Sequence, residues 1–582
     1  MIQRAAEFIR KNLILALIVV GFVILASTGL FYNFGLATTV GDEAPSMSAA
    51  LKMIADHSLR PAYPTLYYPP VNVFAVFPFV LAGVSTLPLL GVPFDPSAIK
   101  EFVILDYAKL LPWVRLASVF YGALSVYVLY QIALRVLRRR EVALLASYFF
   151  ATSLLFIQLA HFGRVWSVQV LLILCGIWMS LRVFDAPSLR RYLIVGMATL
   201  LAFGVNVIGG VVYISFAAAH FLANRGRSLS EILFHRGFLA AHTVIAGGVG
   251  MLYYLNPYGL ENYVRIVRRF FSTVDTAPGI EKALSGGLAR YCGEGIVSGL
   301  TYYPRILAEY DLLILVLFLL GLSIAIFRRD VPRSEGIILG SFGLAYLVGI
   351  TAISAFGVNT CEPRYALPLI PLLALVAASA TYAAIARFGE RSATPILLAV
   401  IIASLYGSVL FDLRLALPST RLEAREWILN NIAHHSRIVT FEEPIALPEN
   451  LEAIRDIEEH APYFLTKKRV YLRDSDVLES PSVPQYYVLT PAYFREGVPE
   501  TLLVEDYDYL VISWWNAEER ALRLRQGYEL ESFKEIELLA RFPEKATETT
   551  ESLDLPNNMR APLFKLHRLT QNGPTIEVYR VR

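Results

Sequence analysis

Long apolar runs, separated by short polar segments, dominate the first 415 residues of the chain. A helix needs about 20 mostly apolar residues to cross the hydrocarbon core of a bilayer. Runs of this kind lie near residues 12–34, 112–137, 142–160, 165–184, 192–208, 210–223, 238–255, 309–327, 335–357, 365–386 and 396–414. The pattern therefore predicts a polytopic α-helical membrane protein with about eleven transmembrane helices.

Arginine clusters between these runs predict the orientation, because short cytoplasmic loops are enriched in Lys and Arg. If the first helix runs outward, the clusters fall at alternate loops, at residues 138–140, 190–191, 225–227, 328–329 and 387–391. The first helix is then retained rather than cleaved as a signal peptide, and the N-terminus is cytoplasmic.

This arrangement requires that one further apolar stretch, Val71–Val92, does not span the membrane. The stretch contains or adjoins five prolines, which remove backbone donors that lipid cannot replace. We interpret it as a juxtamembrane or re-entrant piece on the outer side. The alternative is a kinked twelfth helix, which would place the arginines at 138–140 outside.

The composition of the chain changes after about Leu415, where the long apolar runs end. Residues 421–444 are typical of an amphipathic helix that leads into a strand, and residues 469–474, 507–515 and 574–581 are typical of strands. The sequence therefore predicts a transmembrane domain over residues 1–415 and a C-terminal extracytoplasmic α/β domain over residues 416–582.

Composition narrows the class of protein further. Of the 582 residues, 55% are hydrophobic and 17% are charged, against roughly 25% charged in an ordinary soluble chain. These values exclude a simple soluble enzyme and a disordered chain. The formal net charge of +3 does not indicate a nucleic-acid binder. Three cysteines cannot build a disulfide framework, although one disulfide between Cys292 and Cys361, both predicted outside, stays open.

Polar residues gather in three of the predicted outer turns. They are Asp42, Glu43, His161, Arg164, Glu362, Arg364 and Tyr365. A carboxylate at the membrane surface suits a general base or a metal ligand, and the donor fork of arginine suits a phosphate. Each turn also has a purely structural alternative, namely a helix end in water, a hydrated turn and an ion pair.

Two further outer segments carry candidate residues. The loop 256–308 contains Arg268 and Arg269 among several tyrosines, which suits a lid over an anionic lipid-linked substrate or a solvated basic face. Tyr68 suits the aromatic belt at the membrane interface. Together the outer residues suit transfer from a phosphate-linked donor, in which cations stabilise the departing phosphate while a base removes a proton from the acceptor.

The order of these motifs resembles the GT-C superfamily of membrane glycosyltransferases, in particular the group of the protein O-mannosyltransferases and the aminoarabinose transferase that modifies lipid A. The resemblance covers about residues 1–415. It rests on Gly41-Asp42-Glu43, Tyr68-Pro69-Pro70, residues 113–137, the turn 161–170, and Arg364-Tyr365 before two prolines.

This resemblance implies an inverting transferase that uses a polyprenyl-phosphate sugar donor on the extracytoplasmic side, with a lipid, glycan or protein as acceptor. It implies that Asp42 is the catalytic base and that Glu43 assists. Family members often carry a second acid where this chain has Gln169, and an amide brings no charge to a metal. A divalent metal, held by Asp42 and Glu43 if present, therefore stays open, as do a transporter of lipid-linked saccharides and an inactive assembly subunit.

Overall fold

The structure is a computed structural model. It describes residues 12–31, 43–61, 69–258, 261, 264, 296–328, 333–355, 362–388, 390–441, 445–475, 478, 485–494, 498–499, 502, 506–528, 535–546, 551–553 and 561–582. The chain divides into two compact units. Unit 1 contains residues 1–30, 42–83 and 111–412, and unit 2 contains residues 31–41, 84–110 and 413–582.

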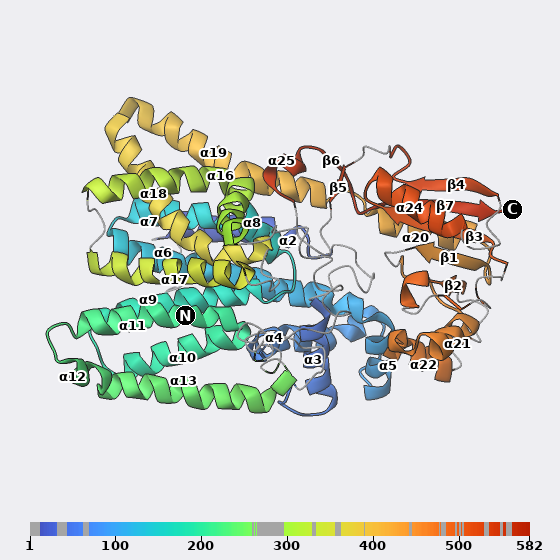
Figure 1. Cartoon of the computed structure of the whole chain (residues 1–582), viewed down its shortest axis with the longest axis horizontal. Helices are drawn as coiled ribbons and strands as arrows, with labels where there is room; N and C mark the ends of the chain where they lie inside the picture. Colours follow the sequence, from blue (N-terminus) through green and yellow to red (C-terminus); the bar gives the residue numbers. More distant parts are fainter. Residues whose placement is uncertain are drawn as a thin grey trace. The chain divides into compact units, whose positions relative to one another are not determined.

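Unit 1 is a bundle of long apolar helices (Figure 1). They are α2 (Leu13–Ser27), α3 (Glu43–Ala55), α4 (Val71–Ser85), α6 (Leu111–Leu137), α7 (Arg140–Ala151), α8 (Leu154–Ala160), α9 (Trp166–Asp185), α10 (Leu189–Val205), α11 (Tyr213–Ala223), α12 (Leu229–Leu233), α13 (Arg236–Leu255), α16 (Ile296–Arg328), α17 (Arg333–Ala355), α18 (Ile370–Phe388) and α19 (Glu390–Leu415), with the 3-10 helices η3 (Val207–Val212) and η4 (Pro363–Leu369). Helix α19 continues into unit 2 at its last residues.

Every predicted apolar run contains one of these helices. Among the described residues, seven helices are long and apolar enough to cross a membrane, and α7 with α8 forms a bent pair that adds an eighth. The fold class is therefore confirmed, while the number of eleven spans stays a prediction. Helix α4 has only 15 residues with Pro78 inside it, a length of about 22 Å against a hydrocarbon core of about 30 Å.

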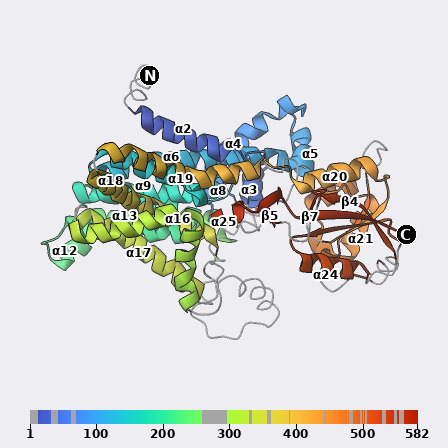
Figure 2. The ribbon, with the colours of Figure 1, turned by 90° about the horizontal axis from the view of Figure 1, so that it is seen from above.

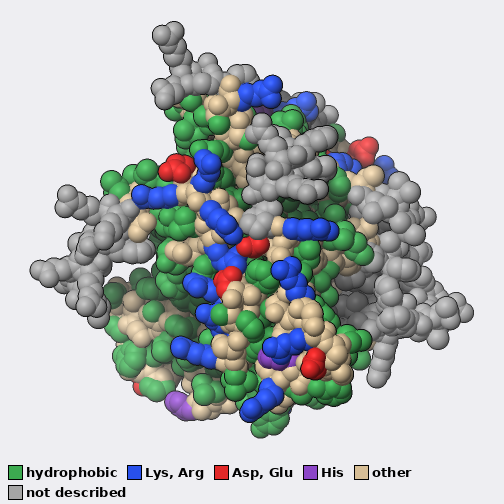
Figure 3. Space-filling model, turned by 90° about the vertical axis from the view of Figure 1, so that its left-hand side faces the viewer, with side chains coloured by type: hydrophobic (Ala, Val, Ile, Leu, Met, Phe, Trp, Pro, Cys, Tyr) green, Lys and Arg blue, Asp and Glu red, His purple; other side chains and the backbone are tan. Residues whose placement is uncertain are grey.

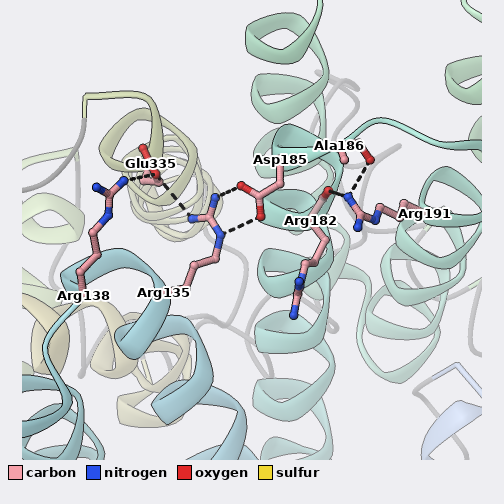
Figure 4. A network of polar contacts seen from close by, with 7 residues as sticks. All are labelled: Arg135, Arg138, Arg182, Asp185, Ala186, Arg191 and Glu335. Atoms are coloured by element: carbon pink, nitrogen blue, oxygen red, sulfur yellow. Dashed lines mark hydrogen bonds and ion pairs between the residues drawn. The ribbon is translucent and has the colours of Figure 1, made fainter.

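The predicted arginine-rich loops meet at one end of unit 1. At this end Arg135 of α6 donates to Asp185 of α9 at 3.0 Å, and Arg135 and Arg138 lie 3.7 and 3.9 Å from Glu335 of α17 (Figure 4). Arg139 contacts the ring of Tyr382 in α18. We call this the arginine end; Figure 3 views this side of the molecule, with Lys and Arg side chains gathered on it.

Unit 2 contains a five-stranded mixed sheet in the order β2-β1-β3-β7-β4 (Figure 1), of which Figure 2 labels β7 and β4. The strands are β1 (Arg437–Phe441), β2 (Tyr487–Leu489), β3 (Tyr509–Trp514), β4 (Ile536–Phe542) and β7 (Thr575–Val581). Strands β2, β1 and β3 are parallel, and β7 is antiparallel to both β3 and β4. A separate parallel pair is formed by β5 (Glu551–Leu553) and β6 (Leu569–Asn572).

Successive residues of the strands pack into two different hydrophobic cores, one on each face of the sheet. Ile438 packs with Ala424 and Ile428 of α20 (Thr420–Asn431). Its neighbour Val439 packs instead with Ile457 of α21 (Leu451–His460). This two-residue period is what a half-buried pleated strand requires, and it confirms the helix and strand predicted within 421–444 and the strands predicted at 507–515 and 574–581.

The strand predicted at residues 469–474 is wrong. This segment lies in the helix α22 (Lys467–Asp474), whose Arg469 pairs with Glu449. Lys468 on the same helix donates to the carbonyl of Leu105 at 3.0 Å, and its burial lowers its pKa. Leu105 belongs to α5 (Pro96–Asp106), so a piece of the first outer loop packs on the C-terminal domain, which local periodicity does not encode.

Candidate functional site

Glu43 begins α3 and is bound to Arg115 in the first turn of α6. Nε and Nη2 of Arg115 donate to the two carboxylate oxygens of Glu43, both at 3.0 Å. Both side chains are 1% exposed. Nη1 of Arg115 donates to the carbonyl of Leu30 at 3.1 Å. The alternative in which Glu43 only ends a helix in water is therefore wrong.

A bidentate pair of this kind gives each buried charge a hydrogen-bonded partner, which is what a buried charge needs. The remaining capacity of Glu43 Oε1 is used by the backbone N–H of Gly163, at 2.7 Å. Gly163 fits because a Cβ at this position would lie 2.5 Å from Cγ1 of Val114. Glu43 therefore joins the segment that follows Asp42 to the turn that carries His161 and Arg164.

His161 lies in the same turn and is fully buried against α19. Its Nδ1 lies 2.7 Å from the carbonyl of Ile157, so this nitrogen carries a proton and donates. Its Nε2 lies 3.1 Å from Oδ1 of Asp412. A protonated His161 ring would form an ion pair with this carboxylate. The other oxygen of Asp412 accepts from the hydroxyl of Thr28 at 3.4 Å.

Asp311 holds the opposite end of the same segment. Helix α16 is broken at this residue, whose φ and ψ of −128° and 48° are not helical. The carboxylate accepts from the hydroxyl of Ser153 at 2.8 Å and from the N–H of Leu154 at 2.9 Å. It thus caps the N-terminus of α8 at the point where α7 and α8 bend by 57°.

Three buried carboxylates from three different helices therefore hold the segment 153–164. Asp311 fixes its start, and Asp412 and Glu43 fix its end. Arg115, Asp311 and Asp412 did not enter the sequence prediction. Each of them is a single charged residue inside an otherwise apolar run. A charged side chain in a membrane costs free energy unless it is paired or functional, so this pattern could have indicated them.

Arg364 lies against the ring of Trp166, two residues after Arg164 in the chain. Arg164 is 5% exposed, and its carbonyl accepts from Ser118 of α6 at 3.3 Å. The guanidinium carbon of Arg364 lies 5.5 Å from the centroid of the Trp166 ring, and Tyr365 meets that ring edge-on at 5.2 Å. The structure thus brings the turn 161–166 and the segment 362–365 together, as the sequence predicts.

Glu362 forms an ion pair with Arg364, and both side chains are 14% exposed. The carbonyl of Tyr365 accepts from Tyr346 of α17 at 3.1 Å, which fixes the backbone of this segment. The ion pair predicted as one alternative is present. It leaves the guanidinium oriented by Glu362, and a guanidinium has five donors, of which a carboxylate uses at most two.

Gln169 lies one helical turn after Trp166 and is fully buried. Within the described part of the chain, neither its amide oxygen nor its amide nitrogen has a hydrogen-bond partner. A buried amide without partners costs about 1–3 kcal/mol. No side-chain hydrogen bond within the described residues therefore explains why a polar side chain is buried at position 169.

Four predicted site residues, Asp42, Tyr68, Arg268 and Arg269, lie outside the described residues. The same is true of Cys292 and Cys361. Their roles stay predictions.

The described residues do not fit a divalent metal. Both oxygens of Glu43 are already bound by Arg115, and Gln169 offers only a neutral amide. No group of three or more His, Cys, Asp and Glu side chains suited to a metal ion occurs in the part of the chain that is described.

Comparisons with known proteins bear on the helical bundle. Residues 110–249 match the family model of dolichyl-phosphate-mannose-protein mannosyltransferase. This range includes Arg115, His161, Arg164 and Gln169. The resemblance to the GT-C membrane glycosyltransferases is thereby confirmed. Together with the apolar helices, the match indicates a multi-pass membrane glycosyltransferase.

Solved structures to which the chain is similar include the crystal structure of ArnT from Cupriavidus metallidurans bound to undecaprenyl phosphate. The two chains share 13% sequence identity at a TM-score of 0.46, over 96% of this chain and 97% of that chain. A comparison with curated protein sequences found no match.

Proposed function

We propose that the protein transfers a sugar from a polyprenyl-phosphate-linked donor to an acceptor on the extracytoplasmic side of the membrane, with inversion at the anomeric carbon. The main support is the contact of Glu43 with Arg115 and Gly163. This contact binds the residue next to Asp42 to the turn that holds Arg164, which supports a common site for the proposed base and the proposed phosphate-binding cation.

In the proposed reaction, Asp42 removes the proton from the acceptor hydroxyl. The acceptor oxygen attacks the anomeric carbon, and the bond from that carbon to the phosphate oxygen breaks with its electron pair on the phosphate. Arg164 and Arg364 stabilise the charge that develops on the departing phosphate. Attack from the face opposite the leaving group inverts the anomeric configuration.

Glu43 has a different role from Asp42 in this proposal. Its carboxylate is occupied by three N–H donors, one of them from a buried guanidinium. These contacts use lone pairs of both oxygens and leave little capacity to take a proton from an acceptor. We assign it the role of a positioning residue that sets the distance between Asp42 and Arg164.

The rival function is a transporter of lipid-linked saccharides. Among the described residues, a carboxylate at a break in a helix inside the bundle favours it. Asp311 is such a residue. However, its carboxylate is occupied by the hydroxyl of Ser153 and the N–H groups of α8. This arrangement accounts for Asp311 as a structural cap, so we favour the transferase.

The test is reconstitution of the purified protein with labelled polyprenyl-phosphate sugars and a panel of lipid, glycan and peptide acceptors. We expect transfer of the label, with a product of inverted configuration and free polyprenyl phosphate. Movement of the intact donor between leaflets without release of polyprenyl phosphate would instead identify a transporter. Retained configuration would contradict the single-displacement reaction.

A further inference from the structure

The connection between α11 and α13 forms a small ordered structure at the arginine end. It contains the single-turn helix α12, whose N-cap Ser228 forms a capping box with Glu231. The carbonyl of Ile232 lies 3.0 Å from Nε2 of His220 in α11, and the hydroxyl of Tyr192 in α10 lies 2.6 Å from Nδ1 of the same ring. These bonds hold α12 in a fixed position against the bundle.

The side of α12 that faces away from the bundle is apolar and uncovered. Leu229 and Phe234 are 65% and 72% exposed, and Leu233, four residues after Leu229, is 40% exposed. In contrast, Ile232 is buried. Large apolar side chains that are fixed outward in a group mark a surface for a membrane or a partner.

Arginines surround these apolar side chains. Arg225 and Arg227 precede α12, Arg236 follows it, and all three are exposed. Within the described segment 225–236, Glu231 is the only acidic residue, and it is occupied by the capping box. The surface therefore combines an apolar centre with a strongly positive rim.

We propose that α12 with its flanking residues is a binding site for anionic phospholipids. Leu229, Leu233 and Phe234 enter the boundary between headgroups and acyl chains, while the three arginines bind the lipid phosphates. The argument for lipid rather than protein is the charge complementarity, together with the position between two membrane helices whose own ends expose Phe221 and Leu239. An apolar face flanked by Arg or Lys is the pattern of helices that lie in the membrane interface.

This proposal is independent of the sugar-transfer reaction. It concerns the opposite end of unit 1 from the turn 161–166, and none of its residues belongs to the proposed catalytic site. Its tests use binding and depth measurements and require no substrate.

The direct test places a fluorescent label at residue 234 of the full chain. In a background in which Cys175, Cys292 and Cys361 are replaced by Ala, Phe234→Cys is labelled with bimane and reconstituted into phosphatidylcholine bilayers with doxyl-labelled lipids. We expect strong quenching by doxyl groups near the headgroup boundary. Tyr463→Cys in the C-terminal domain, where the native side chain is 76% exposed, is the control, and its label is expected to lose far less fluorescence.

A second arm tests the arginine rim. At equal mole fraction, doxyl-labelled phosphatidylglycerol should quench the label at residue 234 more strongly than doxyl-labelled phosphatidylcholine. The two lipids should quench the label equally in a variant that combines Arg225→Gln, Arg227→Gln and Arg236→Gln. High salt should have the same effect on the wild-type arginines.

Equal quenching at residues 463 and 234 would overturn the apolar part of the proposal. An unchanged preference in the triple glutamine variant would overturn the anionic part. Absence of quenching at 234, with a crosslink from that residue to a second copy or another protein, would replace the lipid by a protein partner. Thermal unfolding of each labelled variant in detergent checks that α12 stays packed on the bundle.

Discussion

At the scale of single residues, the described carboxylates hold the site in place, and a different carboxylate, Asp42, is proposed to react. Glu43 and Asp311 accept hydrogen bonds at both oxygens, whereas Asp412 accepts one from Thr28 and lies beside His161. Asp42 is the base in our account, and its identification rests on the sequence motif. The sequence singled out Glu43, Arg164, Arg364 and Tyr365, because polar residues between apolar runs are conspicuous. It did not reveal Arg115 as the partner of Glu43, since 72 positions separate them and no local pattern connects them.

Replacement of Glu43 by Gln should be strongly destabilising. The variant leaves the Arg115 guanidinium buried without its counter-charge, which costs about 3–5 kcal/mol. We expect a clear fall in the thermal unfolding temperature in detergent, and recovery of much of it when Arg115→Met is added. Asp56→Asn is the matched control, because the pair of Asp56 with Lys52 is exposed and should contribute less than about 1 kcal/mol. A single Glu43→Gln variant as stable as the wild type would contradict the structural role.

Asp412→Asn and Asp412→Ala should behave differently. Since His161 donates from Nδ1 to Ile157, a neutral His161 has Nε2 as an acceptor, and an asparagine amide in place of the carboxylate can donate to it. The Asn variant should therefore keep a KM for the donor close to that of the wild type. The Ala variant leaves Nε2 unpaired, at a cost of about 1–3 kcal/mol, and should raise the donor KM. Steady-state kinetics with the labelled donor measures both, and equal effects of the two variants would show that the contact does not position Arg164.

At the scale of elements, the break between α7 and α8 and the break in α16 are joined by hydrogen bonds. The carboxylate at the break in α16 caps the helix that begins at the other break, so α8 points the turn 161–166 toward the segment 362–365. The sequence predicted residues 142–160 as one helix. Apolar periodicity cannot locate this bend, because Thr152 and Ser153 are ordinary residues in a membrane helix and the cap comes from a residue 158 positions away.

Asp311→Ala should disturb α8 as an element. The hydroxyl of Ser153 and the N–H groups of Leu154 and Leu155 lose their acceptor, so we expect lower stability and a higher donor KM, because α8 leads into Arg164. Asp311→Asn keeps one acceptor oxygen and should be intermediate.

The matched control is Asp95→Ala, which removes the N-cap of α5, an exposed cap bonded to Ser97 and Ala98. That loss should cost about 1 kcal/mol and leave the donor KM unchanged. If Asp311→Ala changed the unfolding temperature but not the donor KM, Asp311 would have no role in positioning the site.

At the scale of the whole molecule, the arginine end and the outer turns lie at opposite ends of unit 1. The positive-inside rule predicts that the arginine end faces the cytoplasm. The sequence predicted both the helical bundle and the α/β domain. It did not predict that residues 84–110 pack with the C-terminal domain, since that association depends on tertiary contacts such as the one between Lys468 and Leu105.

The orientation can be tested by labelling single cysteines in intact cells with a membrane-impermeant maleimide. In a cysteine-free background, Tyr463→Cys, at an exposed position of the C-terminal domain, should react from outside. Arg227→Cys, at the arginine end, should react only after the cells are opened. The reverse pattern would mean that α4 spans the membrane, as in the alternative with a kinked twelfth helix.

The most direct test of the account as a whole is the steady-state kinetics of sugar transfer by Asp42→Asn and Arg164→Gln, with the polyprenyl-phosphate donor varied. We expect Asp42→Asn to lower kcat by at least about 100-fold with an unchanged donor KM, because only the proton acceptor is lost. Arg164→Gln should chiefly raise the donor KM, because a phosphate contact is lost. Wild-type kinetics in both variants would show that the acid and the guanidinium at this end of the bundle are not the catalytic site.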